Sequence, residues 1–261
     1  MSWFDAIVLG LVQGVTEFLP VSSSGHLVIA QEVLGVEAAG VFFEVLVHVG
    51  TLISVVWVYR ATVAELLMGA ARGEGGAWSY IGRIALASVP AAFIGFLLED
   101  EIGAAFDSAV FVGAMLLVTA AFLWSTRAAL SRGPDRKVGW SRAFEMGFAQ
   151  AFAILPGISR SGATVTMALW RGVDPDEAAR FSFLMSIPVI LGAGVLELGG
   201  AAVGGGGLAV GPAAAAFVTA AVSGVLAIRL FVRMLRNRTF PAFAPYVALV
   251  GGGFLLYGLL S

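Results

Sequence analysis

The sequence predicts an all-α integral membrane protein, a single domain of six transmembrane helices plus two re-entrant helical hairpins in an inverted-topology repeat. Hydrophobic residues make up 59% of the chain and charged residues only 12%, whereas a soluble domain carries about 25% charge. Six apolar stretches reach the roughly 20 residues that a membrane-spanning helix needs. Two further apolar stretches are shorter, and proline interrupts each of them.

The six spans are expected, in chain order, at about 39–60, 78–98, 107–127, 178–198, 208–230 and 241–260. The two shorter stretches, 3–19 and 143–155, stop at Pro20 and Pro156. A serine- and glycine-containing segment and a second short apolar helix follow each of them. Irregular backbone at membrane depth is stable only where protein or a wet cavity surrounds it. Each pair of short helices is therefore expected to form a hairpin with a buried loop.

Basic residues predict the orientation, because cytoplasmic loops of membrane proteins are rich in lysine and arginine. With six spans, all the lysines and arginines except Arg160 fall at or near one side of the membrane. We expect this side to be cytoplasmic and both chain termini to lie outside. The opposite side receives the acidic segment 99–101, Asp107 and the glycines 204–207. The basic side receives Arg60, Arg72, Arg83, Arg127, Arg132, Arg136, Lys137, Arg142, Arg171, Arg180, Arg229, Arg233, Arg236 and Arg238.

Composition disfavours several classes of site and partner. A net charge of −2 gives no reason to expect a nucleic-acid partner, and the absence of cysteine excludes disulfides and thiolate metal sites. The N-terminal segment lacks a basic stretch followed by a small-residue cleavage site, so no removable signal peptide is expected.

An internal repeat relates the two hairpins. Residues recur at an offset of 137 positions in the pairs Gln13 and Gln150, Ser22 and Ser159, Ser24 and Ser161, and Gly25 and Gly162. Each half, about 1–130 and about 138–261, contains one hairpin and three spans. An odd number of spans inverts the second half relative to the first, and inverted repeats place a shared site near the bilayer midplane. Chance similarity in a chain rich in alanine and glycine is the alternative.

The first hairpin loop carries groups suited to phosphate chemistry. Gln13 and Glu17 share one helix face at a spacing of four residues. The serines 22–24 precede a helix expected to start near Gly25, where serine caps the free N–H groups and the helix dipole favours an anion. His26 adds a titratable ring in the first turn.

The second loop repeats this pattern and adds a cation. Ser159, Ser161 and Gly162 surround Arg160, whose guanidinium matches phosphate oxygens with two parallel donors. The two loops together predict a phosphate pocket with a built-in nucleophile or base. Two simpler interpretations stay open: the serines only cap helices, and Glu17 and Arg160 only form a structural ion pair.

One further carboxylate is a candidate for the pocket. Glu44 lies on the first span, where a lone carboxylate usually faces a cavity. His48 follows it by four residues and is expected to be a packed polar residue rather than a ligand.

Three segments resemble a known family. LVQGVTEFLPVSSSGH at 11–26 and LPGISRSGAT at 155–164 resemble the two signature motifs of the undecaprenyl-diphosphate phosphatases, also called bacitracin-resistance proteins. FFEVLVHVGTL at 42–52 resembles a third, weaker block of that family.

This resemblance implies the removal of the terminal phosphate from undecaprenyl diphosphate, which recycles the lipid carrier of cell-wall synthesis as undecaprenyl phosphate. It also implies a location in the bacterial plasma membrane, a site reached from the outer face and a divalent cation, Mg²⁺ or Ca²⁺. A homodimer is an open alternative to a single chain.

The motif positions imply roles for individual residues. Ser23 matches the proposed nucleophile, His26 the motif histidine and Glu17 the second motif acid, which is also the candidate metal ligand. Arg160 matches the phosphate-binding arginine. The other residues expected at the substrate are Ser22, Ser24, Ser159, Ser161, Gln13, Gly25, Gly162 and Glu44. Gln13 stands at a position that is glutamate or glutamine in the family, which leaves one carboxylate fewer for a metal. Ser23, His26 and an activated water all remain candidates for the first attack on phosphorus.

A carrier is the rival hypothesis, because inverted repeats with broken helices are also a transporter plan. Such a protein would flip an anionic prenyl-phosphate lipid and use serine and arginine for binding alone. The combination of Glu17, serine and His26 favours the enzyme, since a carrier needs no proton acceptor beside a hydroxyl.

Overall fold

The computed structural model describes residues 1–36, 40–106, 108–200 and 209–260. Within these ranges the chain is almost entirely helical and has no β-strand, apart from one isolated bridge between Arg136 and Val173. The all-α class predicted from composition is therefore confirmed. The elements are α1 Trp3–Thr16, α2 Ser23–Leu34, α3 Gly40–Val58, α4 Arg60–Ala71, α5 Gly75–Leu97, α6 Glu99–Phe106, α7 Ala109–Ser131, α8 Trp140–Phe152, α9 Arg160–Trp170, α10 Pro175–Gly200, α11 Val210–Arg236, the 3₁₀ turn Phe240–Ala242 and α12 Phe243–Leu260.

Five helices in the described residues are long and apolar enough to cross a membrane. They are α5, α7, α10, α11 and α12, the last counted together with the 3₁₀ turn before it. A sixth span results if α3 and α4, which bend by 79° at their junction, are counted as one. Five of the predicted spans match these helices within a few residues at each end, and the sixth, 39–60, corresponds to α3.

Helix α4 was not expected as a separate element. The bend lies where Arg60 begins the new helix, its guanidinium 5.4 Å from the centre of the Trp57 ring and hydrogen-bonded to the Trp57 carbonyl. An arginine paired with a tryptophan is typical of the membrane–water boundary. The chain therefore turns where the sequence passes from apolar to charged.

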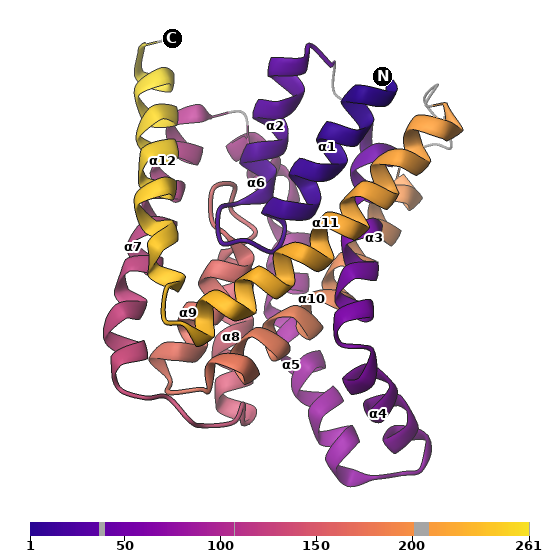
Figure 1. Ribbon diagram of the computed structural model, residues 1–261, viewed down its shortest axis with the longest axis vertical. Coiled ribbons are helices and arrows are strands. Elements are labelled where there is room, and N and C mark those ends of the chain that lie inside the picture. Colours follow the sequence, from indigo (N-terminus) through magenta and orange to yellow (C-terminus); the bar gives the residue numbers. More distant parts are fainter. Residues whose placement is uncertain (37–39, 107, 201–208, 261) are drawn as a thin grey trace.

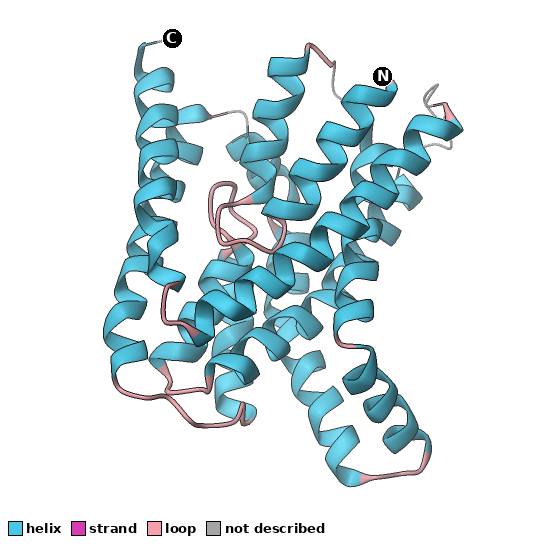
Figure 2. Cartoon of the chain, viewed as in Figure 1, coloured by secondary structure: helices cyan, strands magenta, loops and turns pink. Residues whose placement is uncertain are grey.

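Two helix pairs fold back on themselves and bring their loops together. The hairpin of α1 and α2 enters from the end of the molecule that holds both termini and returns to it, whereas the hairpin of α8 and α9 enters from the opposite end (Figure 1). Both connecting loops lie in the interior, surrounded by the long helices (Figure 2).

The two hairpins are anchored by equivalent contacts. Helix α1 packs against α11, and α8 packs against α5. A Cβ atom at Gly10 would lie 2.4 Å from the Ala216 carbonyl oxygen, and one at Gly147 would lie 2.7 Å from the Ala87 carbonyl oxygen. A glycine thus permits close helix packing in each half, and Gly10 and Gly147 are also 137 residues apart.

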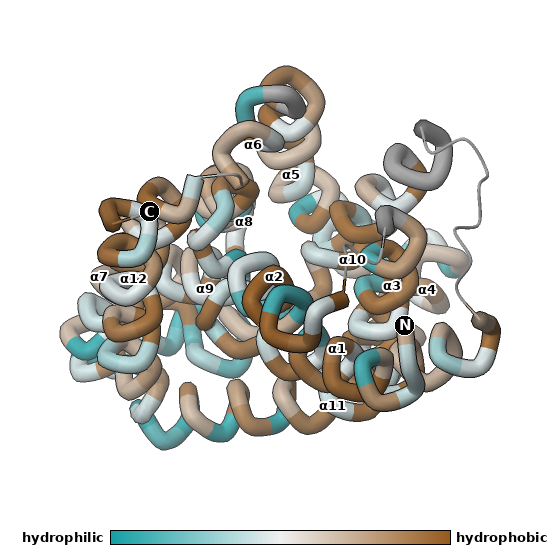
Figure 3. Tube along the Cα trace, turned by 90° about the horizontal axis from the view of Figure 1, so that it is seen from above, coloured by the Kyte–Doolittle hydropathy of each residue, from teal (hydrophilic) through white to brown (hydrophobic). Residues whose placement is uncertain are grey.

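The outer surface is apolar, as expected for contact with lipid. Large hydrophobic side chains such as Phe93, Leu249 and Leu256 are more than 60% exposed, which a soluble monomer rarely tolerates over a large area. Seen from above, the trace of α11 is mostly brown and becomes hydrophilic toward its arginine-containing end (Figure 3).

The basic residues gather at one end. Helix α4, the connection from α7 to α8, the start of α10 and the end of α11 all lie away from the two termini (Figure 1). Of the residues expected at the other end, Asp107, the glycines 204–207 and the side chains of Glu99 and Asp100 are outside the part of the chain that the structure describes.

Candidate active site

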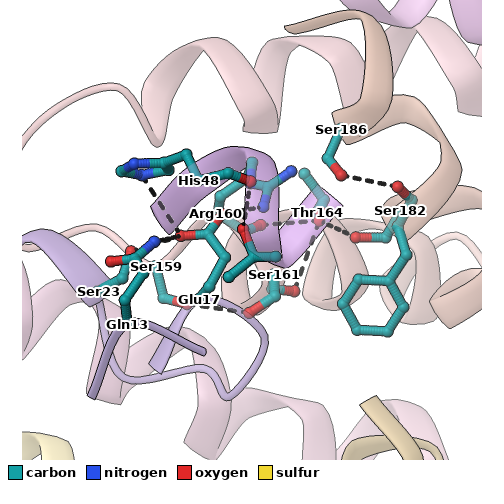
Figure 4. Close-up of polar contacts among 12 residues, drawn as sticks. Gln13, Glu17, Ser23, His48, Ser159, Arg160, Ser161, Thr164, Ser182 and Ser186 are labelled. Atoms are coloured by element: carbon teal, nitrogen blue, oxygen red, sulfur yellow. Dashed lines mark hydrogen bonds and ion pairs between the residues drawn. The ribbon is translucent and has the colours of Figure 1, made fainter. Parts of the chain in front are cut away.

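Glu17 is the point at which the two hairpins meet. It follows α1 directly, and the residue is 8% exposed. Oε1 lies 2.5 Å from Arg160 Nη2, although the two residues are 143 positions apart. Oε2 accepts hydrogen bonds from Ser23 Oγ at 2.8 Å and from Gln13 Nε2 at 3.1 Å. Figure 4 shows this carboxylate between the two loops.

The first loop presents an uncapped helix start. Ser23 is the first residue of α2, and Ser22 precedes it with a φ of +70°, an unusual conformation for a residue other than glycine. Contrary to expectation, no side chain caps α2, because Ser22 Oγ lies 3.4 Å from Ser24 Oγ instead. The N–H groups of the first turn therefore lack the side-chain acceptor that a capped helix has. Such a helix start favours an anion.

The second loop is held rigidly behind Arg160. Ser159 caps α9 by accepting a hydrogen bond from the Gly162 N–H at 3.1 Å, as expected. Thr119 of α7 donates to the Gly157 carbonyl at 2.9 Å and accepts from the Ser159 N–H at 3.1 Å. These bonds fix the backbone from which the Arg160 side chain projects.

A second set of hydroxyls ties this loop to α10. Thr164 Oγ1 donates to the Arg160 carbonyl at 2.8 Å and lies 2.7 Å from Ser182 Oγ. Ser186, also drawn in Figure 4, instead donates to the Phe183 carbonyl. The start of α9 is thus braced from both α7 and α10.

Two buried polar atoms beside Glu17 have no hydrogen-bond partner among the residues that the structure describes. They are Arg160 Nη1 and Gln13 Oε1. A buried donor without an acceptor costs about 1–3 kcal/mol, and more when it carries charge. Arg160 Nη1 is therefore a buried, charged donor that is free to bind an oxygen atom of a ligand. Phosphate oxygens match the geometry of the guanidinium group.

A cavity of about 260 Å³ lies between the two loops. Its walls come from both hairpins and from α3, α5, α6 and α10. Apolar side chains of α3 and α10, such as Val45, Val49 and Ile190, form part of the wall. The sequence-predicted residues that line it are Glu17, Ser22, Ser23, Ser24, Ser159 and Arg160.

Comparison with known proteins identifies the family of the chain. The sequence matches the bacitracin resistance protein BacA family over residues 6–253. The chain belongs to the BacA family. The resemblance noted in the sequence motifs is thereby confirmed.

Three relatives of this BacA family member share a name. Proteins named undecaprenyl-diphosphatase are 40% identical in Desulfatibacillum aliphaticivorans, over 98% of this chain and 99% of the relative, and 42% identical in Salinibacter ruber, over 97% and 98%. A third, from Oceanobacillus iheyensis, is 36% identical over 94% of this chain and 92% of the relative.

Four other predicted residues of this BacA protein lie just behind the cavity wall. Gln13 bonds to Glu17, Ser161 Oγ lies 3.2 Å from Ser159 Oγ, and Gly162 donates to Ser159. Gly25 is buried in the first turn of α2. None of the four is among the residues that line the cavity.

His26 and Glu44 lie elsewhere than expected. His26 is not part of the cavity wall; Nδ1 donates to the Ser22 carbonyl at 2.9 Å, and Nε2 lies 2.7 Å from the Tyr246 hydroxyl of α12. The side chain of Glu44 is exposed and does not reach the cavity. His26 was expected at the site from its place in the first turn after the loop, and Glu44 as a lone carboxylate on a span. Neither argument determines the direction in which the side chain points.

His48 and Gln150 line the cavity instead. His48 Nε2 lies 3.8 Å from Glu17 Oε2, an ion pair only when the ring is protonated. Gln150 donates to the Ala87 carbonyl at 3.3 Å, and its Oε1 has no partner. A signal for Gln150 existed in the sequence, since it is the repeat counterpart of Gln13. His48 lies in the weaker third block, 42–52, but was expected to be a packed polar residue, so only the packing of α3 places it at the cavity.

The side chains at the cavity do not fit a tight metal site. No group of three or more histidine, aspartate or glutamate residues that could hold an ion occurs in the described parts of the chain. Among the residues lining the cavity, Glu17 is the single carboxylate, and both of its oxygens already face donors.

Proposed function

We propose that this chain removes the terminal phosphate of undecaprenyl diphosphate at the cavity between the two hairpin loops. The activity follows from membership of the BacA family and from relatives named undecaprenyl-diphosphatase at about 40% identity over nearly the whole chain. One observation carries the choice of site. The unpartnered, buried Arg160 Nη1 lies beside a carboxylate that accepts a hydrogen bond from a serine hydroxyl.

Ser23 is the proposed nucleophile and Glu17 the proposed base. Because Ser23 Oγ donates its proton to Glu17 Oε2, the oxygen lone pairs are free to attack phosphorus. The bond from the terminal phosphorus to the bridging oxygen breaks, undecaprenyl phosphate leaves, and the phosphoryl group is held on Ser23. Water then attacks the phosphorus, the bond to the Ser23 oxygen breaks, and phosphate leaves. The Ser23 oxygen takes the proton back from Glu17.

Arg160 and the start of α2 supply the positive charge. A phosphate oxygen that binds the guanidinium competes with Glu17 for Arg160, which makes the carboxylate a better proton acceptor. Fixed donors directed at the phosphoryl oxygens stabilise the charge of the transition state. The prenyl chain would lie against the apolar wall that Val45, Val49 and Ile190 form.

The membrane arrangement is part of the proposal. We infer six spans and two re-entrant hairpins, in inverted repeats of about 1–130 and 138–261, with the basic end in the cytoplasm. Support comes from hairpins that start at opposite ends and from the equivalent packing of Gly10 and Gly147. The cavity wall includes Ala193 and Gly194 of α10, far from the start of that helix at the basic end of the molecule, which favours an opening on the outer face.

A divalent cation also stays a prediction. Mg²⁺ usually keeps several waters and binds through one or two carboxylates plus substrate phosphates. A cation that arrives with the diphosphate would suit a cavity with one carboxylate, and no step of the mechanism above passes through it.

The test is phosphate release by purified protein in detergent micelles, where no compartments exist. Ser23→Ala and Arg160→Ala are expected to lower the rate by about 100-fold or more, because each removes a group that acts in the transition state. Ser131→Ala and Arg132→Ala, at exposed positions of the basic end, serve as matched controls with unchanged rates. Wild-type rates in both loop variants would refute the site. Lipid transfer across liposomes without any phosphate release in micelles would favour the carrier.

A further inference from the structure

A second cavity, of about 620 Å³, lies at the basic end of the molecule. Residues of α3, α4, α10 and α11 line it. It shares no lining residue with the cavity between the loops. Four arginines face it, and they are Arg180, Arg229, Arg233 and Arg236.

Two of these arginines are available to a ligand. Arg236 Nε lies 2.7 Å from Asp176 Oδ1, and Arg180 Nη2 lies 2.9 Å from Glu177 Oε2. Arg229 and Arg233 have no ion-pair partner in the parts of the chain that the structure describes, and both are exposed. Since they are four residues apart on α11, they face the same side of that helix. The cavity therefore carries a surplus of positive charge, with Asp176 as its one lining carboxylate.

An apolar groove continues from this cavity. It has a volume of about 400 Å³, runs between α3 and α11, and ends at Arg229, which lines both spaces. Its walls include Trp57, Val222 and Leu226, each more than half exposed on the lipid-facing surface. A cluster of cations that joins an apolar groove matches one molecule with a phosphate at one end and a hydrocarbon chain at the other.

We propose that an anionic glycerophospholipid of the leaflet at the basic end binds here, with its phosphate between Arg229 and Arg233 and an acyl chain in the groove. Basic pockets between transmembrane helices select anionic head groups in this way. Free phosphate would leave the groove unused. A bilayer lipid is favoured as the source because the groove is open to the lipid-facing surface.

Binding at this position would affect stability. The site joins α3, α10 and α11, three helices that pack against one another. A ligand that binds only the folded state raises the free energy of unfolding as its concentration increases. The lipid is therefore expected to raise the melting temperature of the whole protein.

The experiment titrates phosphatidylglycerol into the full-length protein in a neutral detergent and follows the melting temperature. Wild type is expected to show a saturable rise, which phosphatidylcholine and inorganic phosphate do not reproduce. In R229Q/R233Q the midpoint is expected to move to about 25-fold higher lipid concentration, about fivefold for each arginine removed. The control R132Q/K137Q removes two exposed charges from the same end outside the cavity and should respond like wild type.

A second pair of variants tests the groove without changing charge. Val222→Trp fills it and should weaken the lipid effect, whereas Val218→Trp, equally exposed on α11 but outside the groove, should not. Phosphate release in micelles should be unchanged in all these variants, which shows that they fold.

Several outcomes would overturn the proposal. An unchanged phosphatidylglycerol response in R229Q/R233Q rules out the arginines, and an equal response to phosphatidylcholine rules out selection by charge. A rise with inorganic phosphate alone indicates a free-ion site. A rise with undecaprenyl phosphate but not with phosphatidylglycerol indicates a site for the prenyl carrier.

Discussion

Glu17 connects the two hairpin loops. Its Oε1 pairs with Arg160, while its Oε2 accepts a hydrogen bond from Ser23 Oγ. The ion pair and the proposed role as a base therefore involve the same carboxylate. Separating them requires variants in which stability and activity change in different directions.

Such a separation is expected for the Glu17–Arg160 pair. Glu17→Gln and Arg160→Gln each leave an uncompensated buried charge, so each should lower stability by about 3–5 kcal/mol. The double variant removes both charges and should be more stable than either single variant, yet phosphate release should stay at least about 100-fold below wild type. Thermal unfolding and activity in the same detergent measure the two effects.

Glu145→Gln is the control for this comparison. It breaks an ion pair with Arg171 in which the arginine side chain is about half exposed, so the loss should be at most about 1 kcal/mol, with no loss of activity. If the double variant recovered activity together with stability, Glu17 would act only as a brace.

His26 is expected to position the first loop through Ser22 and Tyr246. His26→Ala breaks both hydrogen bonds and should lower both phosphate release and melting temperature. Tyr246→Phe breaks one of them and should have the same effects to a smaller degree. A His26→Ala protein with wild-type melting temperature and no activity would instead assign the imidazole a direct chemical role.

At the scale of elements, the hairpins depend on close contacts with α11 and α5. Hydropathy located every long helix, because a run of apolar residues is a local property of the chain. It ended the first span at residue 60, where α3 gives way to α4, but it did not predict α4 or the 79° bend between the two helices. Nor did it identify the partner of each hairpin, which residues far away in the sequence supply.

Packing at the hairpins can be tested with single methyl groups. Gly10→Ala and Gly147→Ala place a Cβ within 2.4 Å and 2.7 Å of carbonyl oxygens of the neighbouring helices. Each should lower stability by about 1–3 kcal/mol through overpacking, as measured by thermal unfolding in detergent. Gly252→Ala is the matched control, because nothing lies within 4 Å of its Cβ position. Equal stability of all three variants would contradict the close packing.

At the scale of the whole molecule, the charge distribution and the inverted hairpins make one prediction about orientation. The chain has no cysteine, so single cysteines report position without background. Glu32→Cys, near the end that holds the termini, should react with a membrane-impermeant maleimide in right-side-out spheroplasts, whereas Ser131→Cys at the basic end should not. The opposite labelling pattern would invert the proposed topology.

Binding of the predicted divalent cation is expected to require the substrate as well as the folded protein. Chelation by EDTA should abolish phosphate release, and added Mg²⁺ or Ca²⁺ should restore it. The melting temperature without substrate should not change, because the residues at the cavity do not fit a protein-only cation site. A fall in melting temperature on chelation would show that the protein alone holds the ion.

Several features of this protein followed from the sequence alone: the membrane class, the positions of the long helices, the two loop motifs and the charged side. These depend on composition, hydropathy and short-range spacing, which neighbouring residues determine. The meeting of Glu17 with Arg160, the exclusion of His26 from the cavity and the presence of His48 in it depended on the tertiary structure. Spacing determines which residues share a helix face, but the packing of α1 on α11, of α8 on α5 and of α3 beside them determines the direction in which that face points.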